Sequence, residues 1–407
     1  MKNQNIFLIF ILVFVTTTFV KSLTISSSSN LAIQEVNVSF DDHYKPFLTE
    51  SKKLENITCP ELNHTFTNEP PFDILGLPNC YDYIKPVLEL YINDDNKTQC
   101  FMDVRNLPNA NTSKCLQNLK NHKETQKVVI ITHGFLNNFE TKWLHKMQIA
   151  IQSVEKGTAV IILGWSIHGW CDLCHYPQNA ANTRYVSQAL FQIMDNLHTE
   201  FGRPLYTHCI GHSLGAHICG LTGKLLKSSS KTPNFNRISG MDPAGPYFFN
   251  NIPGYPQNVT SASRLDATDA DFVDVIHTDG KVHKFWFLFM SVDFQQYGTL
   301  EPCGDVDFYP GSALTGYGCH QPGCTILQNI FKACSHARGH EYYMASIKEA
   351  SCSADRICHG NPKRYPKNCT DLKKARDKVT MGYWTEINTI PGQYTVEVNS
   401  TSPYCLN

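Results

Sequence analysis

The sequence has no surplus of charge of either sign, since 35 Lys and Arg residues face 36 Asp and Glu residues and the net charge is −1. Such a chain has no field that would attract nucleic acid or an anionic membrane over long range. Long apolar runs are also missing after residue 20, whereas a membrane-spanning helix needs about 20 such residues. These absences predict a protein without a nucleic-acid partner, whose substrate need not be charged.

The low hydrophobicity that marks disordered chains is absent too. Of the 407 residues, 42% are apolar and 11% are aromatic, so the chain can bury a large core. This length suits one large α/β domain or two smaller ones.

The amino terminus carries the pattern of a secretory signal peptide. Lys2 precedes an almost wholly apolar run at residues 6–20, which ends before Lys21 and Ser22. A membrane anchor is the alternative, but about 15 apolar residues are marginal for ~30 Å of hydrocarbon. We therefore expect residues 1–22 to be a signal peptide and the protein to be secreted to the extracellular space. Residues 23–70 are polar and predict a glycosylated leader or a propeptide.

Cysteines and glycosylation sequons agree with that route, because disulfides and N-glycans form in secreted proteins. The chain has 16 cysteines, and Asn-x-Ser/Thr sequons begin at Asn37, Asn56, Asn63, Asn96, Asn111, Asn258, Asn368 and Asn399. Cys171 and Cys174 could belong to a zinc site, but no second pair follows at the usual spacing, so they predict a small bridged loop. Cys209 and Cys219 lie in apolar segments and are expected to be buried free thiols.

Short apolar bursts alternate with helix-length segments along the chain. Strands are expected at residues 87–92, 128–132, 159–163, 205–210, 237–241, 272–276 and 394–398, and helices at 144–154, 182–197 and 216–226. The alternation predicts an α/β fold with a mostly parallel central sheet and helices on both faces. In such sheets the catalytic groups lie at the carboxyl ends of the strands.

One stretch at such a strand end is typical of a nucleophile elbow. Gly211-His212-Ser213-Leu214-Gly215 lies between an expected strand and an expected helix. The turn is so tight that only glycine fits on either side of the serine. The pattern predicts Ser213 as a catalytic nucleophile.

A serine nucleophile needs a general base and an acid that orients this base. In this fold class the acid follows the serine along the chain and the histidine comes last. Asp242 follows an expected strand and is the first candidate for the acid, with Asp279 as its rival; either could instead be a capping aspartate. His336 is the first candidate for the base, ahead of His340 and of His277, which is more typical of a core histidine.

The oxyanion that forms in acyl transfer needs two backbone N–H donors. One donor is expected directly after the nucleophile, at Leu214. The other is expected on the loop after an earlier strand, at Phe135. His133 and Gly134 beside it could also be an ordinary strand-ending turn.

Together these segments resemble the pancreatic lipase family, including its arthropod lipase and phospholipase A1 branch. The resemblance rests on five ordered motifs, namely Thr132-His133-Gly134-Phe135, Ile210-Gly211-His212-Ser213-Leu214-Gly215-Ala216-His217, Gly240-Met241-Asp242-Pro243-Ala244-Gly245-Pro246, Asp274-Val275-Ile276-His277-Thr278-Asp279 and Cys334-Ser335-His336-Ala337-Arg338. It extends from about Phe72 to the carboxyl terminus.

The resemblance implies a disulfide-braced α/β-hydrolase domain at residues 71–407. It implies Ser213, Asp242 and His336 as the catalytic triad, with Phe135 and Leu214 as oxyanion donors. The expected activity is hydrolysis of carboxylic esters of lipids, as in a triacylglycerol lipase. The alternatives are a phospholipase A1 and, because some family members lack catalysis, a secreted lipid-binding protein.

Two loops around the expected site favour different substrates. The expected lid is closed by two cysteines and carries apolar side chains; its residues are Cys324, Ile326, Leu327, Ile330, Phe331 and Cys334. A lid this short resembles that of phospholipases A1. The stretch at 280–306 is long, as in triacylglycerol lipases, and its apolar residues 285–290 could enter a lipid surface or form a buried strand.

The chain also departs from pancreatic lipase in two features. Only about 70 residues follow His336, so we expect no carboxyl-terminal β-sandwich and no colipase partner, only peripheral contact with lipid surfaces. Asp266 and Asp269 resemble part of a structural calcium site, but the glutamate expected near Ser261 is missing. These carboxylates could instead pair with Arg264. No cofactor is expected for the chemistry.

Overall fold

The computed structural model of the protein describes residues 55–93, 99–105, 107, 110–165, 176–250, 252, 255–281, 283–287, 290–294, 296–312, 315–348, 352–356 and 379–405. Two compact units result. The large unit contains the described residues of Phe40–Phe285 and Asp293–Asn407, and the small one contains the described residues of Trp286–Val292. The predicted signal peptide lies outside the described residues.

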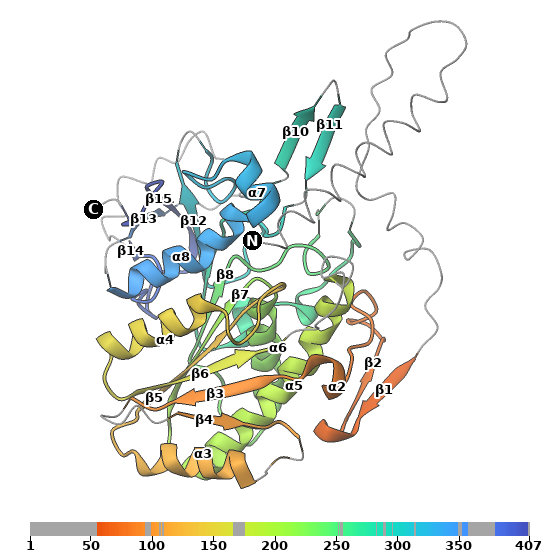
Figure 1. The fold of residues 1–407 in the computed structure, drawn as a ribbon, viewed down its shortest axis with the longest axis vertical. Helices are drawn as coiled ribbons and strands as arrows, with labels where there is room; N and C mark the ends of the chain where they lie inside the picture. The colour runs from red at the N-terminus through yellow and green to blue at the C-terminus, as the bar shows by residue number, and fades with distance from the viewer. Residues whose placement is uncertain are drawn as a thin grey trace, which may run out of the picture. The chain divides into compact units, whose positions relative to one another are not determined.

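A mixed sheet forms the centre of the large unit. Its strands lie in the order β14-β13-β15-β12-β9-β8-β7-β5-β6-β3-β4 (Figure 1). Their bounds are β3 Val87–Tyr91, β4 Gln99–Met102, β5 Lys127–Thr132, β6 Thr158–Gly164, β7 Tyr206–His212, β8 Arg237–Met241, β9 Val273–Ile276, β12 Val306–Gly311, β13 Ser353–Arg356, β14 Val379–Thr380 and β15 Gly392–Glu397.

The central strands of this sheet are parallel. From β6 through β5, β7, β8, β9 and β12 to β15, each neighbouring pair runs in the same direction. Antiparallel pairing is confined to β3, β4, β13 and β14 at the two sides. The apolar bursts explain this arrangement: every residue of β6 is buried, as expected for a strand covered on both faces.

Helices cover both faces of the sheet. Their bounds are α2 Tyr81–Ile84, α3 Ala110–Asn121, α4 Lys142–Val154, α5 Tyr176–Phe201, α6 Leu214–Ser228, α7 Ile326–Lys332 and α8 Cys334–Lys348, with short 3₁₀ turns η3 Pro60–Leu62, η5 Ser261–Ser263 and η6 Ala267–Asp269. Along β5, Val128 and Ile130 pack in one core with α3, α5 and α6. Val129 and Ile131 pack in the other core with α4 and α8, because successive strand residues point to opposite faces. The predicted parallel sheet with helices on both faces is confirmed.

The described part of the predicted leader packs on the same core. Residues 55–70 contain an antiparallel hairpin of β1 Asn56–Cys59 and β2 His64–Thr67. Leu62 and Phe66 are buried in the core formed with α5 and α6. A disulfide joins Cys59 to Cys80. Packed structure is therefore present before residue 71, the position at which we expected the domain to begin.

Five disulfides occur among the described residues. They are Cys59–Cys80, Cys100–Cys115, Cys209–Cys219, Cys324–Cys334 and Cys352–Cys405. The expectation that Cys209 and Cys219 are free thiols was wrong, because β7 and α6 bring their Cα atoms to 5.7 Å and their sulfurs are bonded. Cys171 and Cys174 lie outside the described residues.

Within the described ranges, no helix is both long and apolar enough to cross a membrane. The apolar stretch at 285–290 falls on β10 His283–Phe287 and β11 Met290–Phe294, which form a two-stranded sheet of their own. The burial of these side chains lies outside what the structure describes.

Candidate active site

The parallel strands bring the predicted catalytic residues to one edge of the sheet. Ser213 follows β7, Asp242 follows β8, and Phe135 lies three residues beyond the end of β5. The strand ends are in register, because His212 pairs with Met241 in the ladder. Segments far apart in sequence therefore meet at the carboxyl edge.

The elbow at Ser213 is strained and closely packed. Ser213 has φ 58° and ψ −122°, a backbone conformation that costs a non-glycine residue of order 1–3 kcal/mol and is concentrated at functional sites. A Cβ atom at Gly211 would lie 2.3 Å from the carbonyl oxygen of Gly215. A Cβ atom at Gly134 would lie 2.4 Å from the Cβ of Ser213. Glycine is therefore required at Gly211 for the strand and the helix of the elbow to approach each other, and at Gly134 for the β5 loop to touch Ser213.

Asp242 and His336 form a hydrogen bond with the geometry of an orienting acid and a base. His336 Nδ1 lies 2.6 Å from Asp242 Oδ2. The other carboxylate oxygen accepts the backbone N–H groups of Thr278 at 2.7 Å and Asp279 at 3.2 Å. Since a carboxylate only accepts, Nδ1 of His336 carries the proton, which leaves Nε2 as the proton acceptor.

The rival residues have other partners. The carboxylate of Asp279 accepts the backbone N–H of Tyr297 at 3.3 Å. His277 is fully buried, with Nδ1 2.8 Å from the carbonyl oxygen of Thr299 and Nε2 2.9 Å from Asp307, so it is a core histidine. His340 stacks on Trp143 with ring centroids 4.7 Å apart.

The loop that carries Phe135 is held by His133. The backbone N–H of Trp165 donates to His133 Nε2 at 3.0 Å, so the ring proton sits on Nδ1, which donates to the carbonyl of Gly134 at 2.7 Å. Burial lowers the pKa of His133 to about 4. This neutral imidazole fixes the backbone between β5 and Phe135. Leu214 is the first residue of α6, whose dipole favours negative charge at that end.

Sequence reasoning missed two residues that contact the proposed acid and base. A Cβ atom at Gly298 would lie 2.4 Å from Asp242 Oδ1, so Gly298 lets the chain pass directly over the carboxylate. The ring of Tyr297 lies 5.6 Å from the ring of His336. Only the folded chain brings them there, and no sequence pattern around these residues signals the contact.

The expected lid is a short helix held by a disulfide. Thr325 and Gln328 form a capping box at the start of α7, and Cys324 is bonded to Cys334. Ile326 is 49% exposed and Leu327 is 55% exposed, so both present apolar surface to solvent. The side chains of Ile330 and Phe331 lie outside the described residues.

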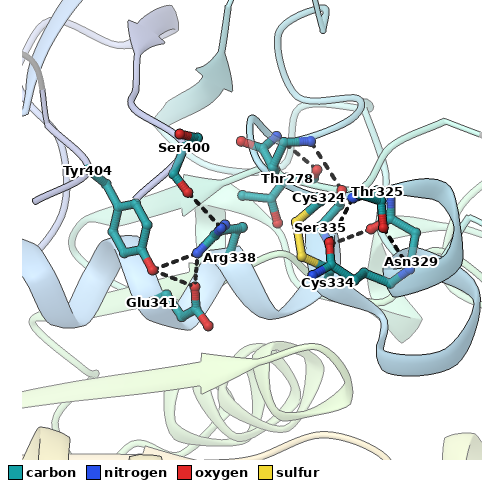
Figure 2. The surroundings of a disulfide bond; sticks show 12 residues. Thr278, Cys324, Thr325, Asn329, Cys334, Ser335, Arg338, Glu341, Ser400 and Tyr404 are labelled. Atoms are coloured by element: carbon teal, nitrogen blue, oxygen red, sulfur yellow. Dashed lines mark hydrogen bonds and ion pairs between the residues drawn. A yellow bond between two sulfur atoms is a disulfide. The ribbon is translucent and has the colours of Figure 1, made fainter. Parts of the chain in front are cut away.

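The first turn of α8, which carries His336, is tied to this lid. The backbone N–H of Ser335 donates to Asn329 Oδ1 at 2.8 Å, beside the disulfide (Figure 2). One turn further, Arg338 bonds to Glu341, to the hydroxyl of Tyr404 at 2.5 Å and to the carbonyl of Ser400 at 3.1 Å. Both sides of the base are therefore anchored to other segments.

The candidate calcium residues have protein partners. Asp269 is buried and forms an ion pair with Lys224, while burial raises its pKa to about 6. Asp266 caps η6 and accepts the N–H of Thr268. The alternative that these carboxylates pair with Arg264 was wrong, because Arg264 reaches across to Glu301 at 3.0 Å.

A second set of possible metal ligands lies in the core. The ligand atoms of His277, Cys303 and Asp307 are within 4.8 Å of one another. Asp307 Oδ1, however, already accepts the N–H groups of Cys303 at 3.0 Å and Gly304 at 3.2 Å. These bonds are those of a buried network that supports the loop before β12.

A comparison with known proteins places the chain among lipases. A family model described as Lipase matches residues 79–404. The chain is 30% identical to the phospholipase A1 of Vespa crabro over 338 residues, which cover 81% of this chain and 97% of that protein. It is 33% identical to the inactive pancreatic lipase-related protein 1 of Homo sapiens over 237 residues, or 56% of this chain and 45% of that protein.

With the pancreatic lipase-related protein 2 of Sus scrofa the chain shares 30% identity over 268 residues, which are 63% of this chain and 50% of that protein. The chain thus spans about half the length of the two vertebrate relatives and nearly all of the wasp relative. The family model covers most of the chain, and the described sheet has the expected α/β-hydrolase arrangement. This protein belongs to the lipase family.

Proposed function

We propose that this protein is a secreted serine hydrolase that cleaves carboxylic ester bonds of lipids. The observation that carries the proposal is the 2.6 Å bond between His336 Nδ1 and the buried Asp242, at the strand edge where Ser213 holds a strained elbow. Membership of the lipase family supports it. The five disulfides fit an oxidising, extracellular setting, and the apolar run at residues 6–20 supports secretion through a signal peptide.

In the proposed reaction, Ser213 Oγ attacks the ester carbonyl while His336 Nε2 takes its proton. Asp242 keeps the imidazole in the required tautomer and stabilises the imidazolium that forms. The backbone N–H groups of Phe135 and Leu214 would stabilise the oxyanion. His336 then protonates the leaving alcohol, which leaves an acyl group on Ser213.

Water completes the cycle by attack on this acyl-enzyme, with His336 again accepting the proton. Collapse of the second tetrahedral intermediate releases the fatty acid and restores Ser213. Loss of one oxyanion donor typically costs about 10²- to 10³-fold in rate. The backbone at Gly134 and Phe135 is therefore expected to matter nearly as much to the rate of the proposed reaction as the triad does.

Phospholipids are a second candidate substrate class beside triacylglycerols. The wasp relative, named a phospholipase A1, aligns over 97% of its own length. The α7 segment between Cys324 and Cys334 is also short, which leaves more room for a polar headgroup than a long lid would. The long stretch at 280–306 favours triacylglycerol instead.

A lipid-binding role without turnover is the alternative from another class. One vertebrate relative is named inactive, so membership of the family does not by itself imply catalysis. The bond between Asp242 and His336 is the feature that favours turnover.

The test is release of fatty acid by the purified full-length protein from emulsified triacylglycerol and from phosphatidylcholine, with Ser213→Ala as the blank. Activity that depends on Ser213 supports the proposal, and the preferred substrate distinguishes the two candidates. Equal release by wild type and Ser213→Ala, or no release from either substrate, would overturn it in favour of the binding protein.

No metal is assigned a part in the proposed reaction. We propose that the ammonium group of Lys224, paired with the buried Asp269, supplies the positive charge that a structural cation would otherwise supply near η6.

The proposed contact with lipid is peripheral and is made by exposed apolar side chains such as Ile326 and Leu327.

A further inference from the structure

His212 stands between Gly211 and Ser213 and contacts the backbone of the proposed base. Its Nε2 lies 3.0 Å from the carbonyl oxygen of His336, 124 residues away in the chain. A carbonyl oxygen only accepts, so Nε2 of His212 carries the proton and donates it. The residue next to the nucleophile is thus bonded to the backbone of the residue that must take the nucleophile's proton.

The imidazole of His212 is held in place by other rings. Its centroid lies 4.6 Å from that of His336, 5.0 Å from that of His340 and 5.9 Å from that of Trp143. Trp143 in turn stacks on His340. The His212 side chain therefore sits in a cluster formed by α4, α8 and the end of β7, with little freedom to rotate.

His212 also remains neutral. It is buried, and burial followed by the nearby imidazoles of His336 and His340 lowers its pKa well below the usual 6.5. Within the described residues, its Nδ1 has no hydrogen-bond partner. Among the residues that the structure describes, the one hydrogen bond of this ring is that to the His336 carbonyl.

The two residues before His336, Cys334 and Ser335, are held by contacts with the lid segment and the chain just before it. Cys334 is bonded to Cys324, and the backbone N–H of Ser335 donates to Asn329 Oδ1 (Figure 2). The hydroxyl of Ser335 accepts the backbone N–H of Gln321 at 3.1 Å. These contacts fix the start of α8 against the α7 segment. The His212 bond instead links α8 to the strand that carries the nucleophile.

We infer that His212 is a positioning residue that sets the distance between Ser213 and the base. The inference rests on the proposed function, because it concerns the geometry of that proton transfer. Without the bond, the backbone of His336 would lose its direct link to the strand that carries Ser213, while the bonds of this turn to Asn329, Gln321 and Asp242 would remain. A shift of about 1 Å between reacting groups can cost about 10²-fold in rate.

The experiment compares variants of the full-length protein on a soluble ester, p-nitrophenyl butyrate. His212→Phe keeps a ring of similar size and removes the donor, and His212→Gln keeps an N–H donor at similar reach. The matched control is His208→Phe, because His208 is fully buried on the same strand but bonds to Ser239 instead of the base. Measurements are kcat, KM and the thermal midpoint.

We expect His212→Phe to lower kcat about 10- to 100-fold with KM changed less than about 2-fold. His212→Gln should recover most of kcat, and His208→Phe should lower the thermal midpoint without a comparable loss of kcat. If His212→Phe does not fold, His212→Leu gives the same comparison with a smaller side chain.

Two results would overturn the inference. One is wild-type kcat in a folded variant without the donor, and the other is a loss in His212→Gln as large as in His212→Phe. Failure of the proposed function is distinguishable, because wild type would then show no turnover that depends on Ser213.

Discussion

Gly298 is a position where a single methyl group would reach the proposed acid. A Cβ atom there would lie 2.4 Å from Oδ1 and 2.7 Å from Oδ2 of Asp242. The carboxylate is fixed by two backbone N–H groups and His336, so it can yield only by giving up one of these bonds. We expect Gly298→Ala to lower kcat on a soluble ester about 10- to 100-fold.

The control for this prediction is Gly202→Ala. Gly202 has φ +62° and nothing within 4 Å of a Cβ atom, so alanine there is strained but touches no catalytic group. It should cost roughly 1 kcal/mol of stability without loss of kcat. Unchanged kcat in a folded Gly298→Ala protein would contradict the close contact with Asp242.

The ion pair of Lys224 beside η6 is predicted to make a large contribution to the free energy of unfolding. Its ammonium pairs with Asp269, whose side chain is 1% exposed, so Lys224→Met would leave a buried carboxylate without a cation. Removal of one partner of a buried pair costs about 3 kcal/mol or more. We expect a loss of this size in urea unfolding, and no change in the midpoint when wild type is treated with a calcium chelator.

Lys227→Met is the matched control. Lys227 is one turn further along α6, and its ammonium donates to the carbonyl of Thr268 at the surface. Such a surface change should stay within about 0.5 kcal/mol. A large drop of the wild-type midpoint on chelation would show that a divalent cation stabilises the protein, in conflict with the proposal.

The residues that sequence could predict are those whose order along the chain has a chemical reason. Ser213, Asp242 and His336 follow from the elbow and from the order of acid and base. Gly298 could not be predicted, because its importance lies in an approach to Asp242 that only the folded chain creates. Lys224 was missed for the same reason: its partner is 45 residues away.

At the level of secondary structure, α7 is the segment through which the proposed contact with lipid can be tested. Ile326 and Leu327 are about half exposed on it. Burial of such side chains in lipid contributes about 1 kcal/mol or more each. The double change Ile326→Ser with Leu327→Ser should therefore lower activity on emulsified or vesicular lipid about 10-fold, with activity on a soluble ester unchanged.

Ile149→Ser is the comparison for that test. Ile149 is 60% exposed on α4 and has equal apolar character, but it belongs to a different helix. It should leave both activities unchanged. An equal loss on soluble and lipid substrates in the α7 variant would mean that these residues support the site itself and not contact with lipid.

Strands with continuous apolar residues were predictable, and irregular ones were not. The strand expected at 237–241 is β8, and the expected helix at 182–197 lies within the longer α5. β12 was missed because Val306–Gly311 contains Asp307 and Pro310, residues that argue against a central strand. Asp307 is satisfied by His277 and two backbone groups, which makes its burial tolerable.

At the scale of the whole molecule, contacts between segments far apart in sequence hold the sheet together, and no local sequence pattern predicts them. Arg237, at the start of β8, bonds to both oxygens of Asp274 and to the carbonyls of Gly382 and Tyr383. One buried guanidinium thus joins the central sheet to a segment about 145 residues later. The parallel sheet could be predicted from apolar bursts, but its order on the β12 side depends on such long-range contacts.

The large unit also buries several neutral histidines. The pKa values of five of them are lowered chiefly by burial, to about 4 for His133, to about 3 for His217 and His340, and well below 6.5 for His208 and His212. In the unfolded chain these groups take up protons near pH 6.5. The unfolded state therefore binds more protons than the folded state between about pH 6.5 and 4.

Stability should consequently be highest above about pH 6.5 and fall as the pH is lowered through this window. For each histidine that stays neutral in the folded state, the unfolding free energy falls by about 1.4 kcal/mol for every pH unit below 6.5. Asp269 acts in the opposite direction, because its raised pKa lets the folded state bind one proton between about 6 and 3.8. The net effect remains a steep loss of stability in acid.

Urea unfolding at several pH values between 7.5 and 5 measures this slope. His208→Phe, which removes one buried histidine away from the proposed triad, should reduce the pH dependence of the unfolding free energy by close to one proton. The absolute stability of the variant can differ, since loss of the bond to Ser239 changes the unfolding free energy by the same amount at every pH. A slope identical to that of wild type would mean that His208 is protonated in the folded protein, in conflict with its complete burial.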